Sequence, residues 1–169
     1  MARDLDLAAL PAHVAFKEWA SIVLALEEGK QDLIFRKGGI AEDGRGFEVE
    51  HDRFLLFPTY FHQQTTGLRD EFAPLLERAM RARPPEGKLV ITSWIEMTRT
   101  FPIEREADLL PLAARHVYAP HVLLDRLAGR YGKTLHALEV KIHVLDRPLE
   151  LPMLDIYAGC KSWVDLEGP

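Results

Sequence analysis

The sequence predicts a single α+β domain over residues 1–169, in which a mixed or antiparallel sheet is flanked by about four helices. The length of 169 residues suits one domain with a sizeable core. Apolar residues make up 47% of the chain and charged residues 28%, which is typical of globular proteins and excludes wholesale disorder. Strand and helix patterns mix without strict alternation, which favours α+β over a doubly wound sheet.

The segment 14–28 is predicted to form the first helix. Phe16, Trp19 and Val23 recur at three- and four-residue spacing and form one apolar stripe. Gly29 suits the left-handed residue that ends many helices. Three further helices are expected at residues 70–82, 104–116 and 120–131.

Four segments rich in β-branched and aromatic residues are predicted to be strands. In the last of them, Leu138, Val140, Ile142 and Val144 are expected to face the core. The segment 146–153 that follows contains two prolines and is expected to break the strand. The four predicted strands are residues 33–37, 47–57, 88–98 and 135–145.

Alternation divides the side chains of the predicted strand 47–57 between two faces. His51 and Arg53 share one face with bulky apolar residues, whereas Glu48 and Glu50 lie on the other. The two glutamates and His51 therefore cannot converge on a metal ion without a bulge. Burying an unpaired arginine costs several kcal/mol, so Arg53 is expected to face a carboxylate, backbone carbonyls or a bound anion.

The composition narrows the classes of partner and compartment. A net charge of −5 argues against a protein coated in positive charge and still permits a local basic groove. The single cysteine, Cys160, excludes an intramolecular disulfide, so a reducing, cytoplasmic compartment is expected. No segment approaches the roughly 20 uninterrupted apolar residues of a membrane span, and no membrane partner is expected.

Most of the chain resembles a known bacterial family. The blocks VAFKEWASIVLALEEGKQDLIFRKGGI and FEVEHDRFLLFPTYFHQ, with the tail YAGCKSWVDL, are similar to the family called domain of unknown function 1802. The RKGGI and EHxRFLLFPTxxHQ motifs are long and specific. This resemblance implies a family and no particular activity.

A second likeness concerns the fold. The start of the chain resembles the PUA-like barrels, especially their ASCH branch, which has glycine, lysine, acid and arginine at the spacing of Gly29, Gln31, Ile34 and Arg36. The resemblance implies a PUA-like β-barrel with a basic rim at Arg36 and Lys37, in a class that usually binds RNA or modified bases. Because glutamine and isoleucine replace the lysine and the acid, the likeness does not extend to ASCH-type catalysis.

The leading hypothesis is a module that binds RNA, DNA or a nucleotide-like ligand without a cofactor. Arginine and lysine side chains hold phosphates, aromatic rings stack on bases, and histidines bond to base edges. Gly38 and Gly39 allow the backbone to approach an anion closely. The candidate binding residues are Arg36, Lys37, His51, Arg53, Tyr60, His62 and Trp94.

Two alternatives stay open. The first is a magnesium-dependent nuclease of the restriction-endonuclease type, in which Glu139 holds the metal and Lys141 supports the attacking water. Asp125 is its expected second carboxylate, although it lies in a predicted helix instead of at a strand end, and His143 shares the exposed face of the strand. The second alternative is a non-catalytic interaction domain, in which the candidate binding residues form a structural network.

Overall fold

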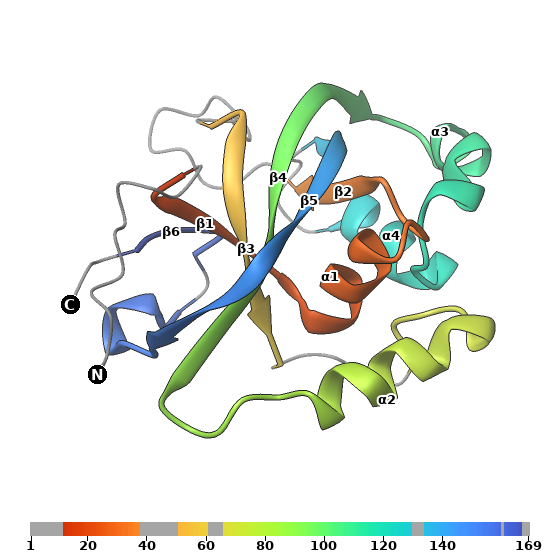
Figure 1. Ribbon diagram of the computed structural model, residues 1–169. Coiled ribbons are helices and arrows are strands. Elements are labelled where there is room, and N and C mark those ends of the chain that lie inside the picture. Colours follow the sequence, from red (N-terminus) through yellow and green to blue (C-terminus); the bar gives the residue numbers. More distant parts are fainter. Residues whose placement is uncertain (1–11, 38–50, 61–65, 130–133, 160, 167–169) are drawn as a thin grey trace.

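The computed structural model describes residues 12–37, 51–60, 66–129, 134–159 and 161–166 (Figure 1). Within these residues a six-stranded sheet has the order β2-β5-β4-β3-β1-β6. β1 runs parallel to β3, and every other neighbouring pair is antiparallel, so the expected α+β class with a mixed sheet is confirmed. The strands are β1 Val14–Trp19, β2 Leu33–Lys37, β3 Arg53–Thr59, β4 Lys88–Ile103, β5 Leu135–Pro152 and β6 Trp163–Asp165.

In Figure 1 the four described α-helices lie to the right of the long β4 and β5 strands, whereas β6, an edge strand of the sheet, and the last short helix lie to the left. Pro74 and Pro120 both fall in the first turn of a helix, where a missing N–H costs nothing. No described helix has the length and apolar character needed to cross a membrane. The helices are α1 Ala20–Glu27, α2 Ala73–Arg81, α3 Glu106–Leu109 and α4 Pro120–Ala128, with the 3₁₀ turns η2 Asp70–Phe72, η3 Leu110–Arg115 and η4 Asp155–Tyr157.

The first predicted helix is wrong over its first six residues, because Val14–Trp19 is strand β1 and the helix begins at Ala20. β1 has apolar packing on both faces. Phe16 belongs to the larger core and Ala15 to a smaller one on the other side of the sheet. A strand that is buried on both faces shows no alternation, and its apolar residues can match a helical stripe by chance.

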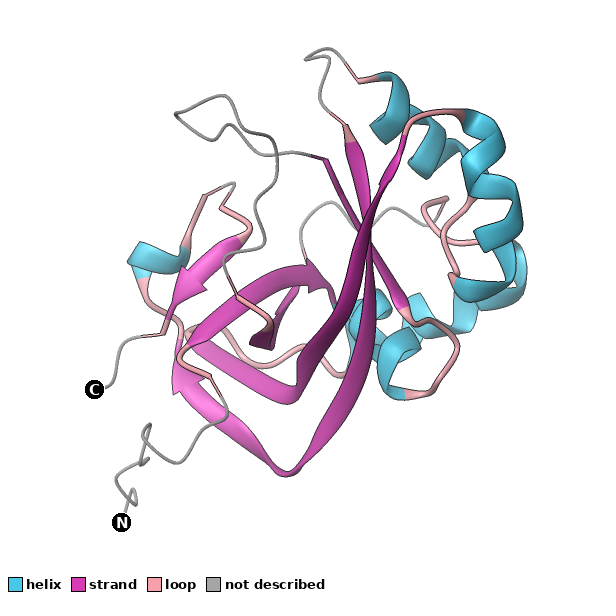
Figure 2. Cartoon of the chain, turned by 90° about the horizontal axis from the view of Figure 1, so that it is seen from above, coloured by secondary structure: helices cyan, strands magenta, loops and turns pink. Residues whose placement is uncertain are grey.

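The expected break at residues 146–153 is also wrong, because β5 continues to Pro152. The pairing with β4 moves from Ser93↔Val144 to Ile91↔Leu149, so the bulge holds more residues on β5 than on β4. Pro148 lies in this bulge, where no ladder hydrogen bond requires its missing N–H. Figure 2 shows the long β4 and β5 strands side by side and strongly bent.

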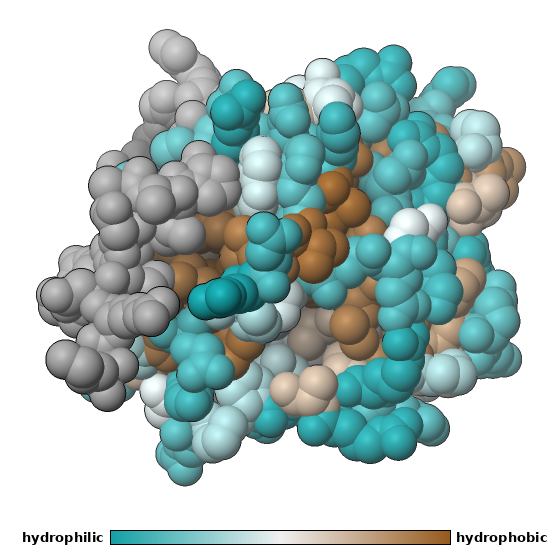
Figure 3. Space-filling view, viewed as in Figure 1, coloured by the Kyte–Doolittle hydropathy of each residue, from teal (hydrophilic) through white to brown (hydrophobic). Residues whose placement is uncertain are grey.

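Two hydrophobic cores stabilise the sheet. The larger core lies under the helices and includes Phe35, Phe54 and Tyr118. The smaller core lies on the opposite face, where Leu55 and Phe57 of β3 contact Tyr157 of η4 and the β6 region. On the face seen in Figure 3, apolar side chains gather near the middle, around the crossing of β4 and β5, with polar side chains around them.

Candidate functional site

The predicted binding residues separate along β3. Arg53 begins this strand and Tyr60 follows its last residue, so the two lie roughly 20 Å apart at 3.3 Å per residue. Trp94 lies near the Arg53 end, because Leu55 and Trp94 are register partners. His62 lies outside the described residues. Among the described candidates, Arg53 and Trp94 therefore lie apart from Tyr60 and do not share one pocket with it.

At the start of β3, the predicted residues contact an acid. Arg53 shares its face with Leu55 and Phe57, as parity requires, and its side chain is 57% exposed and faces a carboxylate, one of the three partners expected for it. Its guanidinium lies 3.9 Å from Glu96, which is itself 3.3 Å from Nε2 of His143. The His143 ring stacks on Trp94 at 4.0 Å between centroids. These contacts form an exposed, nearly neutral patch on the sheet.

His51 occupies a different environment from Arg53. β3 begins at Arg53, so His51 precedes the strand and alternation does not assign it to a face. Its ring meets Trp163 edge-on at 5.5 Å, and Trp163 contacts both Phe16 and Phe54. His51 thus belongs to an aromatic cluster at the β1–β6 edge.

Arg36, on β2, connects two strands that are not neighbours in the sheet. Its Nη2 donates to the Lys17 carbonyl of β1 and lies 3.3 Å from the Glu18 carboxylate. The guanidinium also covers the Phe16 ring at 4.5 Å. β1 and β2 are separated by three strands in the sheet order, so these contacts require the sheet to curl into a partly closed barrel. The Arg36 side chain therefore connects β2 to β1 at the place where the curled sheet is not closed by strand pairing.

Glu18 is the buried centre of this bridge, with a relative exposure of 1%. Its Oε1 accepts hydrogen bonds from the Trp19 N–H at 2.9 Å and from the Tyr118 hydroxyl at 3.4 Å. Burial, together with the Glu18 charge, raises the pKa of Tyr118 to about 12, so the hydroxyl remains a donor at neutral pH. The buried carboxylate therefore has two donors on Oε1 and the Arg36 cation beside Oε2, which itself accepts no hydrogen bond from the described residues.

Two further cations come from α4 and from the end of β2, and of these Arg126 interacts electrostatically with the Glu18 carboxylate. Arg126 of α4 donates to the Phe35 carbonyl at 3.2 Å and lies over the rings of Trp19 and Tyr118 at 5.4 and 5.0 Å. Lys37, the last residue of β2, donates to the Gly129 carbonyl at 3.0 Å. We call this group the basic junction: Arg36, Lys37, Arg126, Trp19, Tyr118 and Glu18.

The sequence prediction contained Arg36 and Lys37 but missed the other four members of the basic junction. Glu18 went unnoticed because it was placed on a helix. A charged residue in the middle of a buried strand is the signal that identifies it, once β1 is recognised. Arg126 lies 91 residues beyond Phe35, to which it bonds, and no local pattern links the two.

Comparison with protein-family models shows to which family the chain belongs. The model described as "Domain of unknown function (DUF1802)" matches residues 15–169. The chain belongs to the DUF1802 family. The resemblance seen in the RKGGI and EHxRFLLFPTxxHQ motifs is thereby confirmed. A comparison of the DUF1802 chain with curated proteins finds no match.

The DUF1802 chain is similar to solved structures of an ASCH protein from Zymomonas mobilis. The unmodified ASCH protein has 10% identity and a TM-score of 0.49, and the match covers 91% of this chain and 87% of that one. A tyrosine-to-phenylalanine variant gives 12% identity and a TM-score of 0.46 over 91% and 89%, and a serine-to-alanine variant gives 10% and 0.47 over 91% and 87%. At TM-scores below 0.5 these similarities say nothing about binding or catalysis in the DUF1802 chain.

The two positions where the DUF1802 chain departs from the ASCH motif have structural roles. The Gln31 side chain is buried, donates to the Leu33 carbonyl at 2.7 Å and accepts from the Val117 N–H at 3.1 Å. Ile34 is fully buried in the larger core. Among these motif positions, Arg36 is the one that both keeps the residue of the ASCH motif and makes polar side-chain contacts, with the Lys17 carbonyl and the Glu18 carboxylate.

Of the residues of the nuclease alternative, Glu139 and Lys141 lie on β5, and Glu139 is held by two arginines. Glu139 accepts from Arg115 at 3.0 Å and from Arg99 at 3.2 Å, and the Arg115 bond lowers the pKa of this carboxyl. Lys141 is exposed. Asp125 lies on α4, away from any strand end. Among the described residues, no three or more His, Cys, Asp and Glu side chains are grouped to hold a metal ion.

Proposed function

We propose that the basic junction binds a phosphate-bearing nucleotide unit, as part of RNA or DNA or as a free nucleotide. The observation that carries the proposal is the local charge: Arg36 and Arg126 lie near one buried carboxylate and Lys37 follows Arg36 on β2, in a chain whose net charge is −5. Half-buried cations attract an anion more strongly than exposed ones, because water screens them less. No chemical step is assigned.

The members of the junction have different roles in this proposal. Lys37 donates one of its three ammonium protons to Gly129, so the others can bond to phosphate oxygens. Trp19 is half-buried and offers ring surface to a base, whereas Tyr118 is fully buried and positions Glu18. Arg36 fixes the geometry by holding β1 and β2 together. Arg53 and Trp94 lie near the start of β3, away from the junction. That a bound nucleic acid also reaches them remains a prediction.

We expect Lys37→Met to weaken binding of a labelled single-stranded RNA about five- to tenfold and to reduce the salt slope of log K by about 1. The methionine keeps the aliphatic stem and removes the charge, so the fold is retained. Fluorescence anisotropy titrations of RNA and of matched DNA, at several salt concentrations, measure both quantities.

Lys88→Met is the matched control, since Lys88 is exposed at the start of β4 and pairs with Glu150 instead of a junction residue. It removes the same charge from the chain. If Lys37→Met and Lys88→Met weaken nucleic-acid binding equally, the loss of affinity comes from the change in net charge and not from the position of Lys37. A wild-type chain that binds neither nucleic acid nor nucleoside monophosphates would refute the proposal and favour the interaction-domain alternative.

Gly129→Ala tests the position of the Lys37 ammonium without changing any charge. A Cβ at residue 129 would lie 2.5 Å from Lys37 Nζ, so the flexible lysine end must move away. We expect nucleic-acid affinity to change severalfold while the melting temperature stays within about 2 °C of wild type, because only a side-chain tip shifts. Unchanged affinity would remove Lys37 from the proposed site.

A further inference from the structure

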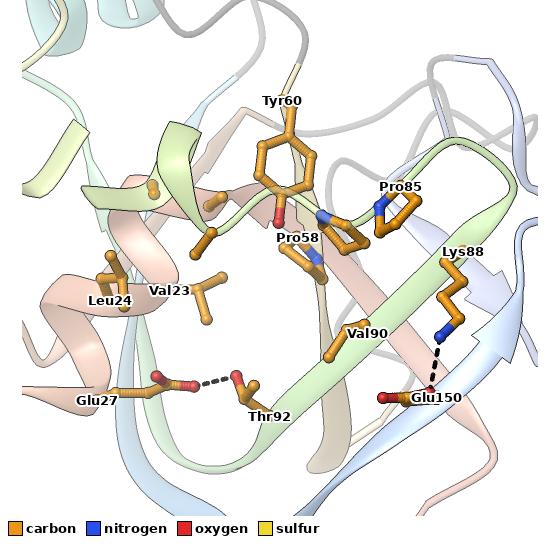
Figure 4. Close-up of a pocket in the computed structure, with 14 residues that line it drawn as sticks. Val23, Leu24, Glu27, Pro58, Tyr60, Pro85, Lys88, Val90, Thr92 and Glu150 are labelled. Carbon is orange, nitrogen blue, oxygen red and sulfur yellow. Dashed lines mark hydrogen bonds and ion pairs between the residues drawn. The ribbon is translucent and has the colours of Figure 1, made fainter. Parts of the chain in front are cut away.

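A groove of about 230 Å³ runs along α1, outside the basic junction (Figure 4). Val23 and Leu24 of α1 form one wall, and Pro58, Pro85 and Val90 line the region opposite. The volume is below the range of drug-sized sites, so it suits a ligand with one ring or a short chain. The lining is mainly apolar, and the position of its polar groups therefore decides which ligand fits.

Two adjacent acids, Glu27 and Glu28, lie at the C-terminal end of α1, and they have different hydrogen-bond partners. Glu28 accepts from Arg78 at 3.0 Å and from Lys30 at 2.7 Å, and these bonds lower its pKa to about 2. Glu27 faces the groove and accepts a hydrogen bond from the Thr92 hydroxyl. Within the described part of the chain, no cation forms an ion pair with Glu27.

The position of Glu27 is electrostatically unfavourable without a cation. The C-terminal end of a helix carries a partial negative charge, which repels an acid in the last turn. α1 has no basic residue in that turn. Glu27 is also half-buried, so water screens its charge less than on an open surface. A bound positive group would relieve both costs.

The charged residues that line the groove sum to a negative charge, and Arg83, which does not line it, lies over the Tyr60 ring at 5.4 Å. Lys88 and Glu150 form an ion pair at 3.0 Å at one side of the groove, so their charges cancel. Tyr60 points its hydroxyl toward the groove in Figure 4, and burial raises the pKa of that hydroxyl, which therefore stays neutral. Glu27 is then the uncompensated charge among the lining residues.

We propose that this groove binds a small organic amine, whose ammonium group pairs with Glu27 and whose apolar part contacts Leu24, Pro58 and Tyr60. Charge complementarity selects the ammonium, and the apolar walls select a hydrocarbon or aromatic body over a polar one. This proposal does not depend on phosphate binding at the basic junction, because no residue of the junction lines the groove.

Phenethylamine is the probe, with phenethyl alcohol as a neutral analogue of nearly the same shape. We expect the amine to bind the full chain with a dissociation constant of about 1 mM or lower, and the alcohol to bind at least about tenfold more weakly. Calorimetry measures affinity, and ligand-observed NMR detects weaker contact. Failure of the amine to bind at this strength, or equal binding of the alcohol, would overturn the proposal.

Glu27→Gln is expected to weaken phenethylamine binding at least about tenfold while the melting temperature is unchanged or higher. The glutamine oxygen still accepts from Thr92, and the repulsion at the helix end is lost, so binding and stability should move separately. Glu77→Gln is the matched control, because Glu77 is an exposed acid of α2 that does not line the groove. Equal weakening by both variants, or none by Glu27→Gln, would contradict the assignment.

Discussion

Arg36→Ala is expected to lower the free energy of unfolding by about 3 to 5 kcal/mol, the range for removing one partner of a buried ion pair. The variant leaves the Glu18 carboxylate in the core without its cation and removes the hydrogen bond to the Lys17 carbonyl. It also removes the cover over the Phe16 ring. Urea unfolding followed by tryptophan fluorescence measures the loss.

The double variant Glu18→Gln with Arg36→Met separates the ion pair from packing. If the buried charge of Glu18 causes the loss, neutralising both partners should recover at least about 1 kcal/mol relative to Arg36→Ala. Arg53→Ala serves as the comparison on β3, since its exposed, 3.9 Å pair with Glu96 is expected to contribute less than about 1 kcal/mol. Similar losses for Arg36→Ala and Arg53→Ala would contradict the role of Arg36 in closing the barrel.

Stability is expected to fall by about 3 kcal/mol between pH 6.5 and pH 4 because of His116. Burial lowers the pKa of this histidine from 6.5 to about 4, with the positive charge of Arg69 acting in the same direction. The folded state therefore binds fewer protons than the unfolded state in this interval. The contribution of neutral His116 is complete above pH 6.5 and is lost as the pH falls toward 4. Urea unfolding at a series of pH values measures it.

His116→Phe is the test variant, because the ring position against Phe35 and Tyr118 is kept and the titration is removed. We expect its stability to be nearly independent of pH between 6.5 and 4.5. The low pKa of Glu28, about 2, acts in a separate window, since its stabilisation is complete above pH 4.5 and is lost below it. An unchanged pH profile in His116→Phe would assign the acid sensitivity to other groups.

The contrast between β1 and β2 shows where local pattern was sufficient. Leu33–Lys37 was predicted with its correct bounds, because a short apolar run between turn residues has few other solutions. Val14–Trp19 was predicted as helix, although each of Val14, Ala15 and Phe16 is buried in a strand. A strand with cores on both faces loses its period of two, and the remaining spacing fitted a helix.

The candidate site shows the same division. Arg36 and Lys37 were expected as a basic rim from the resemblance to the PUA-like barrels, and both belong to the basic junction. His51, Arg53 and Trp94 were grouped with them because a histidine can bond to a base edge, an arginine can hold a phosphate and a tryptophan can stack on a base. Arg53 begins β3 and Tyr60 follows its last residue. Because an extended strand rises about 3.3 Å per residue, the two residues cannot lie close together.

The sequence by itself determined the α+β class, the family, the two cations of β2 and most helices, because each depends on short-range pattern or on long motifs. The tertiary structure alone decided which groups surround those cations. Glu18, Tyr118 and Arg126 come from β1, the segment before α4, and α4 itself, and they meet because the sheet curls until β1 approaches β2. Curling is a property of the whole sheet, set by the packing of two cores, and no local stretch of residues encodes it.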